Sequence, residues 1–180
     1  CSNYVCDLQP GAKVLVTGPV GKSFLMPETP NANLVMIATG TGIAPFRGFL
    51  ATRYGQARRH ERGQCHLFFG MQYGADYLYR EELEAYAAAN DGCHLHTAIS
   101  REQKTADGQR MYVQHRLAEQ CETLFDLLEQ SNSYLFICGL KGMEAGILDA
   151  FQAYGQRSGR DWLALQQRLL TEKRWHIEVY

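Results

Sequence analysis

Long hydrophobic runs and an excess of charge of either sign are both missing from this sequence. No apolar run approaches the roughly 20 residues that a membrane-spanning helix requires, so we expect no membrane span. The 18 Lys and Arg residues nearly balance the 19 Asp and Glu residues, which leaves a net charge of −1. Binding to nucleic acid requires a concentrated positive face, and we therefore expect no nucleic-acid partner.

A recognisable N-terminal targeting segment is also missing. The sequence has neither the pattern of a signal peptide nor that of a transit peptide, and it begins with Cys1 instead of Met. We interpret the chain as the C-terminal part of a longer protein, whose upstream sequence would name the remaining domains. Its 180 residues, 46% hydrophobic and 21% charged, are typical of a soluble chain of one domain or slightly more.

The six cysteines follow no spacing that is typical of a disulfide framework or a zinc site. Disulfide scaffolds belong mainly to small secreted chains, and structural zinc sites usually contain paired Cys-x-x-Cys motifs, which this sequence lacks. One group of potential metal ligands has a spacing that fits no known pattern: His60, Cys65, His66, Cys93, His94 and His96. We expect no metal and a reducing compartment, the cytoplasm, with a plastid or thylakoid-associated location left open.

From residue 32 onward, short apolar runs alternate with amphipathic segments. The runs that we expect to form strands are 34–38, 66–70, 94–99, 134–138 and 175–179. The segments that we expect to form helices lie near 45–58, 79–89, 112–129, 142–157 and 160–171. This alternation predicts an α/β fold, with a five-stranded parallel sheet and helices on both faces. We assign residues 1–31 to the end of a preceding domain and a connector, with a short strand at 13–17, and residues 32–180 to the α/β domain.

A glycine-rich segment, ATGTGIAPFR, follows the first expected strand and precedes a helix. Glycines let the backbone approach a diphosphate, and a helix N-terminus supplies free N–H groups. The residues that would contact a dinucleotide here are Thr39, Gly40, Thr41 and Gly42. Pro45 stands where the common GxGxxG motif has its third glycine, and we expect it at the first helical position. A tight turn between strand and helix is the alternative.

Polar and aromatic residues follow the third expected strand. Ser100 and Arg101 end it, and Arg110 and Tyr112 follow a polar loop. A hydroxyl, two guanidinium groups and an aromatic ring suit the 2′-phosphate and adenine of NADP(H). Solvated loop arginines beside a tyrosine at a helix start would give the same pattern, and spacing alone does not separate the two.

The last two strands also end in residues of chemical interest. Cys138 and Gly139 end the fourth strand, where open α/β sheets bind ligands, and a small thiol there suits a flat ring such as nicotinamide. A buried structural cysteine is the simpler interpretation. The final segment, Trp175 to Tyr180, reads as a strand with large aromatic residues, which an ordinary edge strand would also explain.

Together these segments closely resemble the C-terminal part of plant- and cyanobacterial-type ferredoxin–NADP⁺ reductases. The matching motifs run in order along essentially the whole chain: CSNYVCDLQPG, TGPVGK, ATGTGIAPFR, LYREELE, AISREQ, RMYVQ, ICGLKGME and WHIEVY. The resemblance implies an FAD-binding β-barrel followed by an NADP(H)-binding α/β domain. This chain would hold the second domain, preceded by the last barrel segment, and binding of FAD would require the N-terminal barrel.

The resemblance also implies roles for individual residues around the flavin. Cys138 and Glu178 would stand beside the nicotinamide C4 and the flavin N5, and Tyr180 would stack on the flavin ring. Thr41 would lie between the two cofactors. The residues implied to contact the FAD diphosphate are Cys1 and Ser2.

A second implied set binds the nucleotide. Met71 and Gln72 would line its cleft. The implied 2′-phosphate and adenine site consists of Ser100, Arg101, Arg110, Tyr112 and Gln114. Gly139 and Leu140 would support the middle of the nucleotide. Lys141 stands where many family members have Arg, which keeps the charge and loses the bidentate fork.

The activity implied is hydride transfer between NADP(H) and FAD, with single-electron exchange with a ferredoxin-like iron–sulfur partner. Because the arginine–tyrosine–serine FAD motif of the barrel is absent from this sequence, we expect the isolated chain to be inactive. One alternative is the reductase part of an oxygenase or diflavin-like system, which would use an oxygenase component or a fused iron–sulfur module. A non-catalytic NADP(H) sensor is another.

Overall fold

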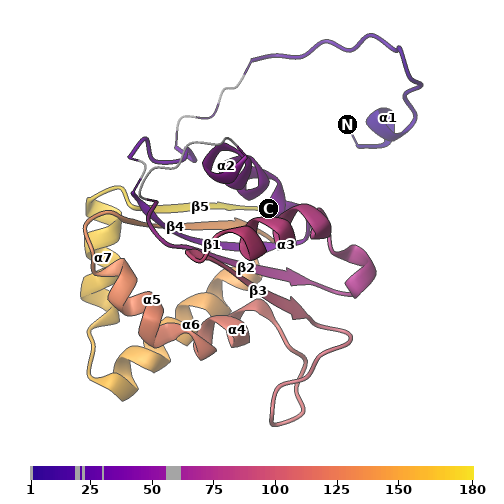
Figure 1. Ribbon diagram of the computed structural model, residues 1–180. Helices are drawn as coiled ribbons and strands as arrows, with labels where there is room; N and C mark the ends of the chain where they lie inside the picture. The colour runs from indigo at the N-terminus through magenta and orange to yellow at the C-terminus, as the bar shows by residue number, and fades with distance from the viewer. Residues whose placement is uncertain (1, 19–20, 22, 30, 56–61) are drawn as a thin grey trace.

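A five-stranded, all-parallel sheet forms the centre of the protein in a computed structural model that describes residues 2–18, 21, 23–29, 31–55 and 62–180. The strands are β1 (Asn33–Thr39), β2 (Cys65–Met71), β3 (Cys93–Ile99), β4 (Ser133–Gly139) and β5 (Trp175–Val179). Their order across the sheet is β3-β2-β1-β4-β5 (Figure 1). The predicted α/β fold is confirmed, and each strand begins and ends within one residue of its predicted range.

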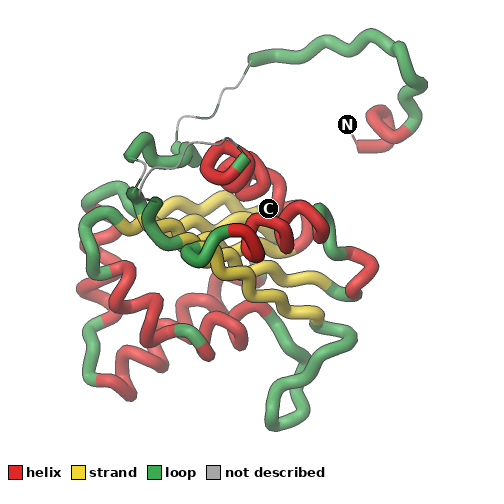
Figure 2. Tube along the Cα trace, viewed as in Figure 1, coloured by secondary structure: helices red, strands yellow, loops and turns green. Residues whose placement is uncertain are grey.

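Helices cover both faces of the sheet, as Figures 1 and 2 show. One face carries α2 (Ala44–Tyr54) and α3 (Arg80–Ala89). The other face carries α4 (Val113–Glu119), α5 (Cys121–Leu128), α6 (Met143–Ser158) and α7 (Trp162–Thr171). Two 3₁₀ turns, η1 (Gly40–Ile43) and η2 (Gly74–Asp76), follow β1 and β2. No helix in the described part of the chain combines the length and apolar character needed to cross a bilayer.

The central strand β1 is buried on both of its faces. Val35 and Ile37 pack on the side of α4 to α7, and Leu34 and Met36 pack on the side of α2. All four side chains are fully buried. A strand covered from both sides carries a continuous apolar run instead of an alternating one, which is why this pattern was readable in the sequence.

The helix predicted at 112–129 is divided in the structure. It forms α4 and α5, separated at Gln120, whose φ of −114° and ψ of 5° lie outside the helical range. The Gln120 N–H donates to the Leu117 carbonyl at 2.9 Å, a tighter i→i−3 bond that ends α4. The Leu124 N–H then donates to the Gln120 carbonyl at 3.0 Å and starts α5. The apolar stripe survives the break, because its residues are buried on both sides of it: Val113, Leu117, Cys121, Leu124 and Leu128.

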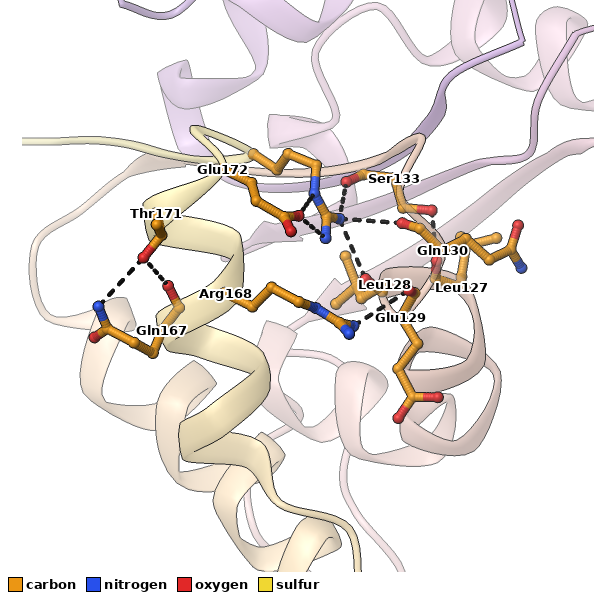
Figure 3. Close-up of polar contacts among 10 residues, drawn as sticks. Leu127, Leu128, Glu129, Gln130, Ser133, Gln167, Arg168, Thr171 and Glu172 are labelled. Carbon is orange, nitrogen blue, oxygen red and sulfur yellow. Dashed lines mark hydrogen bonds and ion pairs between the residues drawn. The ribbon is translucent and has the colours of Figure 1, made fainter.

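Two arginines close the end of α5 and fix it to the start of β4. Figure 3 labels one of them, Arg168, beside Glu129 and Ser133. Arg174 is only 3% exposed and donates to the carbonyls of Leu128, Gln130 and Ser133 at 3.3, 3.1 and 2.6 Å. Its guanidinium also pairs with Glu172 at 2.7 Å. Arg168 donates to a further carbonyl of the same turn. Carbonyl groups at a helix end lack hydrogen-bond partners within the helix. Because the two guanidinium groups supply these partners, burying the end of α5 costs less free energy.

The segment before residue 19 lies outside the two-faced α/β arrangement (Figures 1 and 2). It contains a short helix, α1 (Ser2–Cys6). The strand predicted at 13–17 is not formed, and the residues there are exposed. A strand needs a neighbour for its N–H and C=O groups, and no described segment of the chain pairs with this one.

Candidate functional site

The carboxyl ends of the five strands meet at one edge of the sheet, where the candidate site lies. The chain proceeds from β1 to β2 and β3 on one side and returns to β4 and β5 on the other. In open α/β sheets, ligands bind outside the carboxyl ends at the point where the strand order reverses. That point lies here between β1 and β4, next to the glycine-rich turn.

The glycine-rich turn passes close to the end of β4. Gly40 adopts a left-handed φ of 54°, a conformation that costs glycine little. A Cβ on Gly42 would overlap the Cys138 carbonyl and lie 2.8 Å from the Gly139 Cα. The turn therefore requires glycine for a close backbone approach. The helix α2 begins one residue before its predicted start, so that Pro45 is its second residue.

The end of β4 makes the reciprocal contact with β1. Gly139 has a φ of 143°, and a Cβ there would lie 2.9 Å from the Thr39 nitrogen. The Thr39 hydroxyl accepts a hydrogen bond from the Leu140 N–H at 3.0 Å and donates to the Met143 sulfur at 2.9 Å. These contacts hold the ends of β1 and β4 and the start of α6 in one rigid arrangement.

A cleft of about 630 Å³ opens beside this contact and runs toward β2 and β3. Nine of the residues predicted to bind the nucleotide line it: Thr39, Gly40, Met71, Gln72, Ser100, Arg101, Tyr112, Gln114 and Leu140. Its remaining lining residues are Gly70, Asp76, Ala98, Met111, Val113, Gly142 and Met143. Residues from β1, β2, β3, α4 and α6 thus surround one shared space.

The β3 end of the cleft is polar and cationic. Ser100 is 8% exposed and donates its hydroxyl to the Met71 carbonyl at 3.2 Å. The backbone N–H of Arg101 donates to the Gln72 carbonyl at 2.9 Å, which fixes the position of Arg101 on the cleft wall. Among the described residues, neither Arg101 nor Arg110 is in a salt bridge. Both are exposed, and so their charges are available to an anion.

A hairpin carries the second of these arginines. Lys104 and Arg110 form an antiparallel bridge, and Arg110 itself does not line the cleft. Tyr112 follows nearby, lines the cleft and is 42% exposed as a residue. The Tyr112 N–H donates to His115 Nδ1 at 3.0 Å and so fixes the residue at the start of α4. An exposed ring beside two guanidinium groups is suited to a planar, phosphorylated ligand.

A second cluster lies where β4 and β5 end. Cys138 is paired with Glu178 in the sheet register. Burial, with a smaller effect of Glu178, raises the pKa of the Cys138 thiol, so the group is a neutral thiol near pH 7. Both effects oppose its activation as a nucleophile, because the reactive form is the thiolate.

Tyr180 continues the pairing of β5 with the loop after β4. Its N–H donates to the Gly139 carbonyl and its own carbonyl accepts from Lys141, both at 3.0 Å. Its hydroxyl and that of Thr41 share a 2.5 Å hydrogen bond. The residue as a whole is still 62% exposed. A large aromatic surface is therefore held in a fixed place beside the glycine-rich turn.

The structure does not bring all predicted site residues into the cleft. Cys1 lies outside the described residues, and Ser2 begins α1 on the segment before residue 19. Residues that adjoin the cleft without lining it are Thr41, Gly42, Arg110, Cys138, Gly139, Lys141, Glu178 and Tyr180. Within the described ranges, no three His, Cys, Asp or Glu residues are grouped closely enough to hold a metal ion.

Several lining residues were not predicted from the sequence. Met111 and Val113 flank Tyr112, and Gly142 and Met143 follow Lys141 directly. Their positions just after strand ends and at helix starts are the signal that could have found them. Asp76 gave no such signal, because it lies in η2, where its carboxylate accepts from the Tyr73 N–H at 3.1 Å.

Comparison with known proteins agrees with this geometry. Residues 36–149 match the family described as "Oxidoreductase NAD-binding domain". The chain belongs to this family. The oxidoreductase NAD-binding domain here includes the glycine-rich turn, the cleft walls from β1 to β4 and most of the cationic end. The resemblance predicted from the sequence motifs is also confirmed by individual relatives.

These relatives are similar along the whole chain. The chain is 45% identical to ferredoxin–NADP reductase of Synechocystis sp. over 100% of its own length and 44% of the relative's. It is 47% identical to ferredoxin–NADP reductase of Thermosynechococcus vestitus, covering 48% of that protein. It is 44% identical to the chloroplastic leaf isozyme 1 of ferredoxin–NADP reductase from Arabidopsis thaliana, covering 51% of that protein. The chain thus spans about half the length of the curated relatives it matches.

Proposed function

We propose that this chain is the NADP(H)-binding part of a flavoprotein reductase that transfers hydride between NADP(H) and FAD and exchanges single electrons with a ferredoxin. The observation that carries the proposal is a single cleft lined both by Arg101, which is in no salt bridge among the described residues, and by the close-packed, glycine-rich turn. The names of the relatives support the electron partner.

The residues present fit NADP(H). Ser100, Arg101 and Tyr112 would hold the 2′-phosphate and adenine, with Arg110 on the adjoining hairpin adding charge. Gly40 and Leu140 leave room for the diphosphate at the turn, where η1 and α2 begin. Met71, Gln72 and Gln114 would line the space between these ends. The cationic end favours NADP(H) over NAD(H), because a 2′-phosphate recruits cations where a ribose hydroxyl usually meets an acid.

The nicotinamide end would lie at the β4–β5 cluster. Cys138 would position the ring as a neutral contact, and Glu178 would stabilise positive charge that develops near the ring. FAD, when bound, would accept or donate the hydride and split the electron pair into single electrons. Tyr180 presents an exposed ring suited to stacking on a flavin. Cys1 and Ser2 are the candidates for contact with the FAD diphosphate.

Two alternative functions find less support. An oxygenase reductase or diflavin-like chain would use the same cleft, but no relative considered above carries such a name. A non-catalytic NADP(H) sensor has no need for a fixed, exposed ring at the nicotinamide end, and Tyr180 argues against it. We propose a cytoplasmic location and ferredoxin as the partner.

Selectivity between the two dinucleotides tests the proposal. Replacing Arg101 by Ala removes one charge-assisted contact of roughly 1.5–3 kcal/mol, which should weaken NADP⁺ binding about 10- to 100-fold and leave NAD⁺ binding almost unchanged. Titration calorimetry with both nucleotides measures this. Arg157→Ala, an exposed arginine in the last turn of α6, is the matched control. Equal losses for NADP⁺ and NAD⁺ at Arg101 would refute the phosphate contact.

A further inference from the structure

Two cysteines face each other at the opposite edge of the sheet from the cleft. Cys65 is the first residue of β2 and Cys93 the first residue of β3, and the sheet register pairs them directly. Both pack into the core cluster on the side of α2 and α3. Their side chains therefore leave the sheet on the same face, at the amino ends of neighbouring strands.

The spacing of the two residues suits a disulfide. Neighbouring strands lie about 4.7–4.9 Å apart, and the Cα atoms of disulfide-bonded cysteines are usually about 4.4–6.8 Å apart. Residues directly opposite each other in the register meet this condition without a shift of either strand. Hydrogen bonding between the thiols lowers the pKa of Cys93 and raises that of Cys65, which places the two groups in direct contact.

The two thiols differ in access. Cys65 is fully buried, whereas Cys93 is 7% exposed on the edge strand β3. A small oxidant approaching from the strand edge would reach Cys93 first, and Cys65 lies behind it. A second thiol within reach is typical of redox-sensitive cysteine pairs, and the less deeply buried of the two is the one we expect to be oxidised first.

The end of α2 supplies groups that favour a thiolate. The Tyr54 hydroxyl and Arg53 Nε are buried and have no hydrogen-bond partner among the described residues. The hydrogen bond from Cys65 has the largest effect and lowers the pKa of Cys93. Burial opposes it, and Tyr54 and the positive charge of Arg53 lower the pKa further. A neutral thiol is a weak acceptor. A thiolate at Cys93 would give the Tyr54 hydroxyl a strong hydrogen-bond acceptor.

We propose that Cys93 and Cys65 form a peroxide-reactive pair in which Cys93 is oxidised first and Cys65 resolves it to a disulfide. The Cys93 thiolate attacks one oxygen of hydrogen peroxide, the O–O bond breaks, and hydroxide leaves and takes up a proton as water. Cys93 is then a sulfenic acid. The Cys65 sulfur attacks the Cys93 sulfur, the S–O bond breaks, and a second water leaves with the Cys65 proton. Two thiols are oxidised by two electrons, and one peroxide is reduced to two waters.

The site is separate from the nucleotide cleft, which lies at the carboxyl ends of the same strands. Cys121 and Cys138 are buried elsewhere, and burial raises the pKa of each thiol, that of Cys121 to about 11. These two cysteines provide internal references for reactivity.

Peptide mapping of the wild-type protein after treatment with hydrogen peroxide tests the pair directly. Free thiols are blocked with iodoacetamide, and digestion with mass spectrometry should show a peptide that links Cys65 to Cys93 and is lost on reduction. Before treatment, Cys93 should react with iodoacetamide more than about tenfold faster than Cys121, because its thiolate fraction is larger. A Cys93 that reacts no faster than Cys121, or the absence of the linked peptide, would overturn the proposal.

Two variants separate the roles of the cysteines. In Cys65→Ser, the Cys93 sulfenic acid has no resolving thiol and should be trapped by dimedone. In Cys93→Ser, Cys65 should remain unmodified by peroxide. If dimedone labels Cys65 in Cys93→Ser to the same extent as it labels Cys93 in Cys65→Ser, the assigned order is contradicted. If either variant fails to fold, the peptide map of the peroxide-treated wild-type protein still tests the pair.

Discussion

Tyr180 combines a fixed backbone with an exposed side chain at the end of the sheet. Its backbone is paired on both sides, to the Gly139 carbonyl and the Lys141 N–H. Its hydroxyl bonds to Thr41 on the glycine-rich turn, and its ring remains exposed. If nicotinamide is to reach the flavin, this ring must move aside. The residue would then act as a gate as well as a stacking surface.

We predict that Tyr180→Ser in the FAD-containing protein tightens nucleotide binding and slows turnover. Displacing an aromatic stack costs about 0.5–1.5 kcal/mol beyond lost burial, and the variant no longer bears this cost. Discrimination against NAD⁺ should fall, since nicotinamide contact is common to both nucleotides. Steady-state rates and affinities for NADP⁺ and NAD⁺ measure these effects. Tyr180→Phe, which keeps the ring and loses the hydrogen bond to Thr41, is the control. Unchanged affinities in Tyr180→Ser would contradict the gating role and leave Tyr180 with only a structural role at the end of β5.

Among the elements, the turn between β1 and α2 is the one most restricted by its neighbours. A Cβ added at Gly42 would overlap the Cys138 carbonyl, whereas a Cβ added at Gly48, six residues later in α2, would lie in open space. The two glycines therefore occupy opposite environments within one short stretch. The first is required for packing, and the second only lowers the helix propensity of α2.

We predict opposite effects of alanine at these two glycines. Gly42→Ala forces the backbone of β4 away and should lower the free energy of unfolding by about 1–3 kcal/mol. Gly48→Ala should raise it by up to about 1 kcal/mol, because glycine is the poorer helix former. Urea denaturation of both variants beside the wild type measures the two changes. Similar stability of the two variants would show that the turn can relax.

Sequence patterns predicted the elements with unequal success. The strands were found because burial on both faces leaves continuous apolar runs. The break at Gln120 was missed, because the apolar stripe continues across it and only local backbone hydrogen bonds mark the division. The strand at 13–17 was predicted from an apolar pattern alone, which does not reveal whether a partner strand is present. The glycine-rich turn was found because close approach demands a specific residue type, whereas Asp76 was missed because its place in the cleft depends on the path of a loop.

At the scale of the whole molecule, the fold keeps two histidine side chains, on the adjacent strands β2 and β3, neutral. His66 of β2 is 3% exposed and shares a 3.4 Å contact between its Nδ1 and His96 Nε2 on β3. Burial, with the neighbouring His94 and His96, lowers the pKa of His66 to about 3. Burial and His94 also lower the pKa of His96, to about 4. In the native sheet, the His66 and His96 side chains therefore stay unprotonated at pH values just below 6.5, where the same side chains bind protons in the unfolded chain.

We predict that the free energy of unfolding falls as the pH drops from 7 to 5. Below pH 6.5 the unfolded state binds protons that the native state does not, so each of the two histidines removes up to about 2 kcal/mol by pH 5. Urea denaturation across this range measures the slope. The double variant His66→Gln and His96→Gln should flatten it. A slope unaffected by the double variant would assign the pH dependence to other groups.

The position of β1 between β2 and β4 has a consequence for synthesis on the ribosome. The partner of β1 along one edge, β2, is the next strand in the chain. Its partner along the other edge, β4, starts at Ser133, 100 residues after Asn33. Until β4 emerges, a nascent chain that has paired β1 with β2 exposes the other edge of its most apolar strand. An open, hydrophobic strand edge is a site of misassembly. Nascent chains and C-terminal truncations that end before residue 133 should therefore depend on chaperones to a degree that the finished domain does not.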